Sequence, residues 1–190
     1  MVNQDNLGSY VIKGNNLSFS AVTQRDAEYI FYLRSNPDYN KHLSPPPSTV
    51  EMQEKWIAEY LFRNKLGEEY YFLIRRLDND QRCGLVRIYN IQNQGFTWGS
   101  WILDQNKPAK AAIDSALLVY KFAFEILKLD FCEFDVRKSN IGTLHFHDSF
   151  GATRIKEDSS DIYFRFSSAM WDKSKNLLIS RYFKKNQGLL

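Results

Sequence analysis

Short stretches in which apolar and polar residues alternate, or in which apolar residues dominate, predict strands along the chain. These stretches cover residues 17–22, 69–77, 82–91, 96–103, 131–136, 152–157 and 161–166. Apolar residues at spacings of three and four predict helices over 23–35, 48–65, 112–128 and 140–150, and a last helix over about 168–185. Residues 1–16 are polar and rich in Asn and Gly, so we expect an irregular lead-in there.

Residues that commonly begin or end helices mark most of these boundaries. Residues 23–26 resemble a capping box with Asp26 in place of Glu, and residues 48–51 form a complete box that would begin at Ser48. Pro37 is expected to end the first helix, and Gly151 to end the helix over 140–150. Residues 36–47 then form a loop stiffened by prolines. The helix over 48–65 carries its apolar side chains on one side, formed by Met52, Trp56, Ile57, Tyr60 and Leu61.

Residues 96–140 contain a strand, a basic turn, a helix and a second strand in succession. The first N–H groups of a helix have no partner within it, and the helix dipole places a partial positive charge there. Such a turn is therefore an anion site, most naturally for phosphate. Its candidate ligands are the lysines Lys107 and Lys110 and the backbone N–H groups of Ala109, Ala111, Ala112 and Ile113. The alternative is an ordinary solvated turn with two lysines.

The order and spacing of these elements resemble the GCN5-related N-acetyltransferases. In that family the turn reads Gln/Arg-x-x-Gly-x-Gly/Ala and holds the pyrophosphate of acyl-CoA; here Asn106 replaces Gln/Arg, and Ala109 and Ala111 replace the glycines. A second family pattern, Asn followed by a helix ending Leu-Tyr-x-x-x-Gly-Phe, is matched by Asn140, Phe146, His147, Gly151 and Ala152. The resemblance covers about residues 17–166.

The resemblance implies an α/β (α+β) fold with a mixed, mostly antiparallel sheet flanked by helices on both faces. We expect residues 1–190 to form a single acyl-CoA-dependent domain. The helix over about 168–185 lies beyond the resemblance, and its wide apolar face must be covered either by the sheet or by a second copy of the chain in a homodimer.

The resemblance also assigns catalytic positions. The strand over 96–103 would separate from the next strand, and a freed backbone N–H of Trp101, Ile102 or Leu103 would face the thioester carbonyl of acyl-CoA. His147 stands where the family has a tyrosine that protonates the departing thiolate, with Asn140 and Phe146 beside it on the cofactor side. The alternatives are that the three strand residues are simply core and that His147 only packs.

The acceptor of the acyl group is expected at the loop between the first two helices. In the resembled family the loop after the first helix receives it, which here places Tyr39, Asn40 and His42 near the amine. His42 could take the proton of the amine, or be an exposed loop histidine. Arg87, Tyr89 and Trp98, with Glu133 or Asp135, could line the pocket by stacking on a sugar or base and pairing with a diphosphate; the alternative is a polar sheet edge without a ligand.

The segments 122–127 and 146–152 are closest in character to family members that acylate amino groups of nucleotide-linked sugars. We therefore expect transfer of an acetyl group, or of a longer chain such as 3-hydroxybutyryl, from acyl-CoA to an amino sugar on dTDP or UDP, as in O-antigen or other lipopolysaccharide precursors. Two alternatives are a protein N-terminal acetyltransferase of the ribosomal-protein type and a non-catalytic acyl-CoA-binding protein. The alternative of a non-catalytic protein stays open because Ala109 and Ala111 replace the glycines of the family's turn.

Composition narrows the picture only slightly. With 44% hydrophobic and 15% aromatic residues the 190-residue chain can build a core, and a net charge of +3 does not indicate nucleic acid or a membrane as a partner. No apolar run approaches the roughly 18 residues that span a bilayer. Cys83 and Cys132 lie in predicted strands and are expected to be buried free thiols of a cytoplasmic protein. No spacing of ligands predicts a metal site, and two cysteines without partners make a thiol nucleophile a poor alternative.

Overall fold

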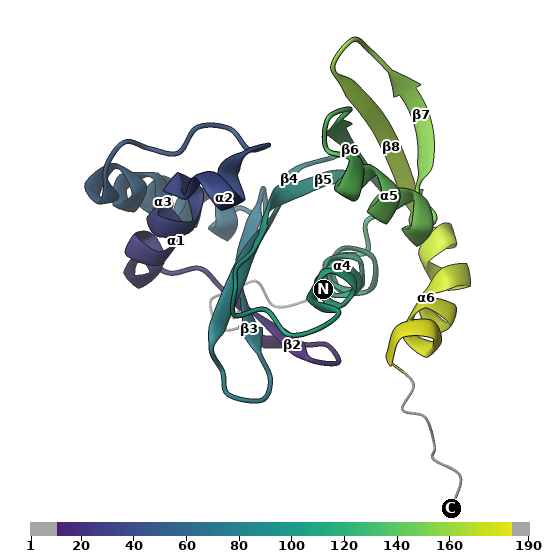
Figure 1. Cartoon of the computed structure of the whole chain (residues 1–190), viewed down its shortest axis with the longest axis horizontal. Coiled ribbons are helices and arrows are strands. Elements are labelled where there is room, and N and C mark those ends of the chain that lie inside the picture. Colours follow the sequence, from purple (N-terminus) through teal and green to yellow (C-terminus); the bar gives the residue numbers. More distant parts are fainter. Residues whose placement is uncertain (1–10, 184–190) are drawn as a thin grey trace, which may run out of the picture.

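An eight-stranded sheet runs through the computed structural model, which describes residues 11–183 (Figure 1). The strand order is β1-β2-β3-β4-β5-β6-β8-β7, and every neighbouring pair is antiparallel except β5 and β6. The strands are β1 (Val11–Lys13), β2 (Leu17–Ala21), β3 (Tyr70–Arg76), β4 (Arg82–Gln92), β5 (Gly95–Leu103), β6 (Phe131–Arg137), β7 (Thr153–Glu157) and β8 (Asp161–Ser167). The predicted mixed, mostly antiparallel sheet is confirmed.

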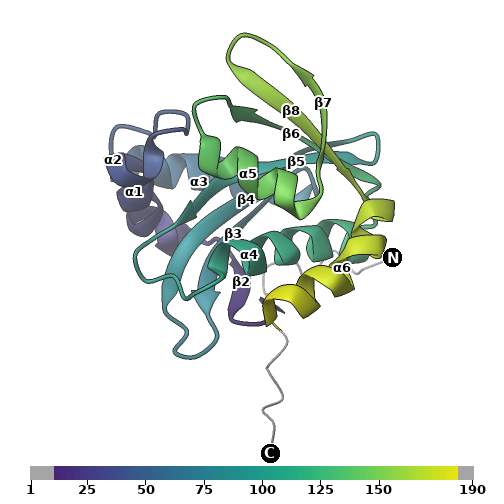
Figure 2. The same ribbon diagram turned by 45° about the vertical axis from the view of Figure 1, so that its right-hand side comes forward.

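Helices cover both faces of this sheet, as predicted (Figures 1 and 2). On one face lie α1 (Ala27–Ser35), which follows the 3₁₀ turn η2 (Gln24–Asp26), α2 (Pro37–Asn40) and α3 (Val50–Lys65). On the other lie α4 (Ala111–Tyr120), its π-helical continuation η3 (Lys121–Ile126), α5 (Ile141–Phe150) and α6 (Ser168–Phe183).

Each face has its own hydrophobic core, because side chains of a strand alternate between the two faces. Along β3, Tyr71 and Leu73 pack with α1 and α3, whereas Phe72 and Ile74 pack with α4. The core on the α4 side is the larger of the two. Aromatic side chains in it, including Phe124 and Phe166, surround Tyr120, which is 1% exposed. The helices that the sequence predicts before and after the sheet centre therefore end up on opposite sides.

Two local expectations were wrong, and one predicted helix changes its geometry part-way along. Val11–Lys13, expected to be irregular, is a strand, because it pairs with β2 over three residues. The expected loop begins with the one-turn helix Pro37–Asn40, in which Asn36 accepts a bond from the N–H of Asp38 (2.9 Å) and proline takes its favoured first position. The helix after Ala111 does not stay α-helical, because its ladder shifts to π geometry from Lys121, with Leu127 N–H bonded to Phe122.

Helix α3 begins and faces differently from the prediction. Thr49 rather than Ser48 is its N-cap, since its hydroxyl accepts from the N–H of Met52 (3.3 Å). Met52 is 50% exposed, whereas Gln53 is fully buried together with Ile57 and Tyr60. The buried side is therefore rotated by about one residue from the purely apolar one, and it includes polar residues.

The last helix buries less than its apolar content suggested. Trp171 and Leu178 are buried, but Leu177 is 60% and Ile179 38% exposed. The helix is also anchored by polar contacts: Glu125 accepts from the indole of Trp171 (2.9 Å) and from Lys175 (3.0 Å). Its described part ends at Phe183, so the predicted last two residues lie outside the described range.

Cys83 and Cys132 are both buried and unpaired, as predicted. Between residues 11 and 183, no helix is both long and apolar enough to cross a bilayer. The same range contains no group of three or more His, Cys, Asp or Glu side chains that could hold a metal ion.

Candidate functional site

The central feature of the site is the separation of β5 from β6. The two parallel strands pair only at Gly95–Phe131 and Phe96–Cys132, while β6 pairs with β8 along its whole length. Past Phe96 no described strand pairs with this edge of β5, and a cavity of about 370 Å³ opens there. Its walls come from β5, β6, α5 and the loop after α2, and include His42, Trp98, Trp101, Asp135, Asn140 and His147. The separation expected from the family resemblance is therefore present.

A β-bulge lies in the part of β5 that runs beside the cavity. Arg87 pairs with Gly99 and Leu85 pairs with Ile102, so Ser100 and Trp101 together lie opposite Val86. Ser100 is left-handed, with φ of 47°. A bulge bends its strand and increases its twist, so β5 is bent beside the cavity.

The bulge also bears on which backbone groups face the cavity. The N–H of Asp104 donates to Cys83 in β4 (2.9 Å). Because N–H groups alternate between the two sides of a strand, that of Ile102 points to β4 as well, and that of Leu103 points to the β6 side. Of the three predicted oxyanion donors, Leu103 thus has its N–H on the side of β5 away from β4, whereas Trp101 is the one that lines the cavity. The role of each stays a prediction.

His147 closes the inner end of the cavity. It is 3% exposed, lies 4.3 Å from the ring of Phe134 and 5.5 Å from that of Trp98 between centroids, and its Nδ1 has no partner. Burial lowers the pKa of His147 from 6.5 to about 3, against a small opposing effect of Asp148. The ring is therefore uncharged at neutral pH, which weighs against a proton-donating imidazolium in the role that the sequence suggested.

Helix α5 orients the other residues of the Asn140 pattern. Asn140 is its N-cap and accepts a bond from the N–H of Thr143 (3.3 Å) while lining the cavity. Phe146 packs on Trp101 of β5, with ring centroids 5.3 Å apart. His145, two positions before His147, is exposed on another side of the helix. Asn140 and His147 thus line the cavity, whereas Phe146 lies behind Trp101; their roles toward a cofactor stay predictions.

The first turn of α4 offers free backbone donors. The N–H of Asp114 makes the first bond of the helix, to the carbonyl of Lys110 (3.0 Å), and that of Ala111 is bonded within the preceding turn. The N–H groups of Ala112 and Ile113 therefore precede any helical partner and remain available for phosphate oxygens.

In the turn before α4 the left-handed backbone position is taken by a lysine, and the two alanines that replace the family's glycines do not need it. Neither Ala109 nor Ala111 has a positive φ; Lys110 between them does, at 64°. The ammonium of Lys110 donates to the carbonyl of Tyr182 and lies 5.8 Å from the ring centre of Phe183 in α6. Lys110 is consequently anchored to the last helix, a contact that the sequence did not predict.

A second lysine stays within the turn: Lys107 Nζ is 3.4 Å from the carbonyl of Asp104. The turn itself is held by Asp104, whose buried carboxylate accepts from the hydroxyl of Tyr29 (2.8 Å) and from the N–H of Asn106 (2.7 Å). Burial and the bond to Asp104 raise the pKa of Tyr29, which keeps its proton in place as the donor. The sequence does not predict this contact, because Tyr29 and Asp104 belong to distant segments.

The one acid in the first turn of α4 is turned away from the free N–H groups at the start of this helix. The carboxylate of Asp114 is completely buried and accepts from the backbone N–H groups of Asn15 (3.0 Å), Asn16 (2.6 Å) and Leu17 (2.9 Å). A Cβ at position 14 would come within 2.7 Å of this carboxylate, so Gly14 permits the approach. Asp114 thereby fastens the β1–β2 turn to α4.

The predicted acceptor residues do not all lie at the cavity. His42, Tyr89 and Trp98 line it, whereas Asn40 does not. Tyr39 faces the turn between β5 and α4 instead, where its hydroxyl accepts a bond from the N–H of Gln105 (3.3 Å).

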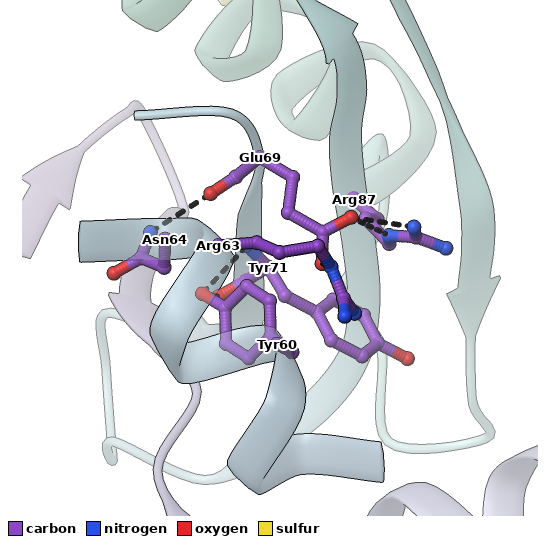
Figure 3. Close-up of polar contacts among 6 residues, drawn as sticks. All are labelled: Tyr60, Arg63, Asn64, Glu69, Tyr71 and Arg87. Carbon is purple, nitrogen blue, oxygen red and sulfur yellow. Dashed lines mark hydrogen bonds and ion pairs between the residues drawn. The ribbon is translucent and has the colours of Figure 1, made fainter. Parts of the chain in front are cut away.

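Arg87 is held next to the cavity by a polar cluster (Figure 3). Its guanidinium binds Glu69, with Nε 3.1 Å from Oε2, and Arg63 binds the other carboxylate oxygen at 3.1 Å. The guanidinium carbon also lies 5.1 Å and 4.7 Å from the ring centres of Trp56 and Tyr89. Arg87 is thus fixed in position before any ligand binds.

The sequence of this chain matches a known protein family. The family model described as an acetyltransferase (GNAT) domain matches residues 16–153. The chain belongs to this family. It is accordingly an acyl-CoA-dependent acyltransferase, and acyl-CoA is its cosubstrate.

Solved structures agree with the assignment. The structure described as "Apo FdhC- a nucleotide-linked sugar GNAT" is 36% identical, with a TM-score of 0.84, and covers 93% of this chain and 99% of its own. A spermidine N-acetyltransferase chimera (SpeG from Vibrio cholerae and hSSAT) shares the fold at 15% identity, with a TM-score of 0.70 and coverage of 82% and 98%. No curated protein sequence matches this chain.

Proposed function

We propose that this GNAT enzyme transfers an acyl group, acetyl or a longer chain such as 3-hydroxybutyryl, from acyl-CoA to the amino group of a dTDP- or UDP-linked amino sugar. The observation that carries the proposal is the cavity between β5 and β6. One wall is the strand that leads directly into the phosphate-binding turn, and another is the loop that carries His42. The 36% identical structure, described as a nucleotide-linked sugar GNAT, supports the choice of acceptor.

The cofactor side of the chain fits acyl-CoA. The N–H groups of Ala112 and Ile113 would hold its pyrophosphate, since Asp114 is turned away and Lys110 supplies the left-handed position. When bound, acyl-CoA supplies a thioester whose carbonyl carbon bonds to the amine nitrogen as the carbon–sulfur bond breaks. The N–H of Leu103, on the open side of β5, would donate to the oxygen that becomes negative, with Trp101 beside it at the bulge.

The acceptor side would bind and orient the amine. The half-buried Tyr89 would contact the sugar, with the buried Trp98 as part of the wall behind it, and Asp135 offers a carboxylate to a primary amine. His42 would accept the amine proton, directly or through water. Holding both reactants in one cavity supplies most of the rate, because orientation replaces a bimolecular encounter.

His147 takes a different role from the one its position suggested. Since burial keeps its ring uncharged, we propose that it orients the leaving sulfur through a ring N–H and does not deliver a proton as imidazolium.

Two alternatives are separated by the same assay. A protein N-terminal acetyltransferase would acylate a peptide amine, and a non-catalytic acyl-CoA-binding protein would release no thiol at all. The acceptor side favours the sugar nucleotide over a peptide, because arginines and aromatic rings, and not a row of carboxylates, surround it.

The experiment incubates the full chain and acetyl-CoA with dTDP- and UDP-linked amino sugars, following thiol release and product mass. The matched control is each nucleotide sugar with a hydroxyl in place of the amine. We expect thiol release and a mass increase of one acyl group with at least one amino sugar and none with the control. Acylation of peptides or polyamines alone, or no release with any amine, would refute the proposal.

A further inference from the structure

A second hollow lies beside the active-site cavity, between the proline-rich loop after α2 and helix α3. Its volume is about 580 Å³, and its lining includes Arg34, Ser44, Pro46, Lys55, Trp56 and Arg87. Ser44 lines both this hollow and the active-site cavity, so the two are adjacent. We call it the Arg34 hollow.

Arg34 is the unusual residue in it. The side chain is on the buried side of α1, and the residue is 7% exposed. One terminal nitrogen donates to the carbonyl (3.2 Å) and hydroxyl (3.1 Å) of Ser44, while Nε has no partner. No carboxylate of residues 11–183 forms an ion pair with it. Guanidinium groups stay charged in proteins, and buried charges are normally paired, so this arginine lacks the anion that its surroundings call for.

Arg87 also lines the Arg34 hollow, and both arginines lie near the side chain of Tyr71. The hydroxyl of Tyr71, in the strand next to Arg87, is fully buried and lies against the guanidinium of Arg34, although no hydrogen bond of regular geometry joins them. Burial raises the pKa of Tyr71 to about 12, and Arg34 and Arg87 both oppose this rise. The two guanidinium groups are therefore near one point, and Arg87 is already fixed there by Glu69, Trp56 and Tyr89.

The charge around the hollow is unbalanced by about the charge of a diphosphate. Four cations, Arg34, Lys55, Arg63 and Arg87, stand against two carboxylates, Glu59 and Glu69. The diphosphate of a nucleotide sugar carries one negative charge on each phosphate. Arginine forks match phosphate oxygens in geometry as well as in charge.

We infer that the Arg34 hollow binds the diphosphate of the nucleotide-linked acceptor, with Arg34 and Arg87 as its ligands and Lys55 at the rim. This inference rests on the proposed function, and it adds a separate recognition site to it. The sugar would then extend past Ser44 into the active-site cavity, bringing its amine toward β5. The nucleotide is recognised outside the cavity, which leaves the cavity itself for the sugar and the thioester.

The test measures binding of dTDP, of inorganic pyrophosphate and of CoA to the full chain by calorimetry. Arg34→Met keeps the aliphatic stem and removes the charge; we expect dTDP affinity to fall at least about tenfold. Lys55→Gln, at an exposed position, should weaken it about two- to threefold. The matched control is Arg75→Met, another partly buried arginine, bonded to Ser20 and Asp80 and remote from this hollow. It should leave dTDP affinity unchanged.

CoA affinity serves as the folding control for every variant. Unchanged CoA binding with lost dTDP binding supports the inference, as does competition between pyrophosphate and dTDP in the presence of saturating CoA. Equal dTDP affinity in wild type, Arg34→Met and Lys55→Gln would overturn it, and so would displacement of dTDP by CoA. If Arg34→Met fails to fold, Lys55→Gln and the competition decide.

The failure of this inference can be told apart from the failure of the proposed function. If the wild type acylates a nucleotide-linked amino sugar and Arg34→Met does so with an unchanged KM, only the Arg34 hollow is refuted. If the wild type binds no dTDP and acylates a different class of amine, the proposed function itself fails.

Discussion

Single buried polar residues determine how the site is assembled. Asp114 ties the β1–β2 turn to α4, the helix after the turn that we propose binds phosphate, and Asp104 holds that turn to α1. Neither carboxylate faces the expected ligand positions; each organises backbone that does. The sequence identified the turn but not these supports, because a lone aspartate carries no signal for its distant partners.

Replacing Asp114 with Asn should destabilise the protein by about 2–3 kcal/mol, since charge-assisted bonds to three backbone N–H groups are lost and an amide NH₂ meets donors. Chemical denaturation measures the change. Asp130→Asn is the matched control, because Asp130 is exposed and its side chain has no described contact; it should stay within about 0.5 kcal/mol of wild type. Equal effects of the two changes would contradict the anchoring role.

His147 makes the folding stability depend on pH in a defined direction. Its pKa is about 3 when folded and 6.5 when unfolded, so between these values the unfolded chain binds the extra proton. The stability contribution is complete above pH 6.5 and is lost as the pH falls toward 3, by about 1.4 kcal/mol per pH unit. From pH 8 to pH 5 the wild type should therefore lose about 2 kcal/mol more than His147→Phe. Denaturation at both pH values measures this; identical losses in the two proteins would show that the histidine is not buried in its neutral form.

At the scale of elements, the separation of β5 from β6 opens the cavity, and one extra residue in β5 bends the strand beside it. The apolar run 96–103 predicts the strand, and its composition also predicts burial. The bulge is invisible in that pattern, because Ser100 is a common strand residue and its left-handed backbone depends on pairing with β4. The separation of β5 from β6 was available only through family resemblance. Similarly, nothing in 112–128 distinguishes the α-helical part from the π-helical part.

Changing Ser100 tests the bulge. Ser100→Val should destabilise the protein by about 1–2 kcal/mol and lower turnover, since a β-branched residue resists a φ of 47°. Ser100→Gly, which accepts that backbone freely, should keep both stability and turnover close to wild type. Denaturation and thiol release measure the two effects. A valine variant as stable and as active as the glycine variant would contradict a role of the bulge in shaping the site.

At the scale of the whole molecule, the two helical layers meet at the cofactor turn. Tyr29 and Tyr39, from helices on one face of the sheet, bind Asp104 and Gln105, while Lys110 binds the end of α6 on the other face. The sequence predicted both layers and their elements closely, because periodicity and capping are local signals. It could not predict which residues join the layers, since those contacts link segments as far apart as Tyr29 and Asp104.

Tyr29→Phe should loosen this junction. Loss of the hydroxyl leaves the buried Asp104 carboxylate with one donor fewer, at a cost of about 1–3 kcal/mol in unfolding free energy. We expect CoA affinity to fall as well, because the turn is less well ordered before binding. Tyr32→Phe, three residues later in α1 and 54% exposed, is the control and should change neither quantity. If calorimetry finds CoA binding intact in Tyr29→Phe, the contact between Tyr29 and Asp104 has no part in forming the cofactor site.

The most direct measurement of the central claim is a crystal structure of the full chain with CoA and a dTDP-linked amino sugar. We predict the pyrophosphate of CoA at the N–H groups of Ala112 and Ile113, its sulfur beside the bulge of β5, and the sugar amine facing that sulfur in the cavity between β5 and β6. A complex in which CoA binds elsewhere, or in which side chains fill the cavity and keep the amine and the sulfur apart, would contradict the account.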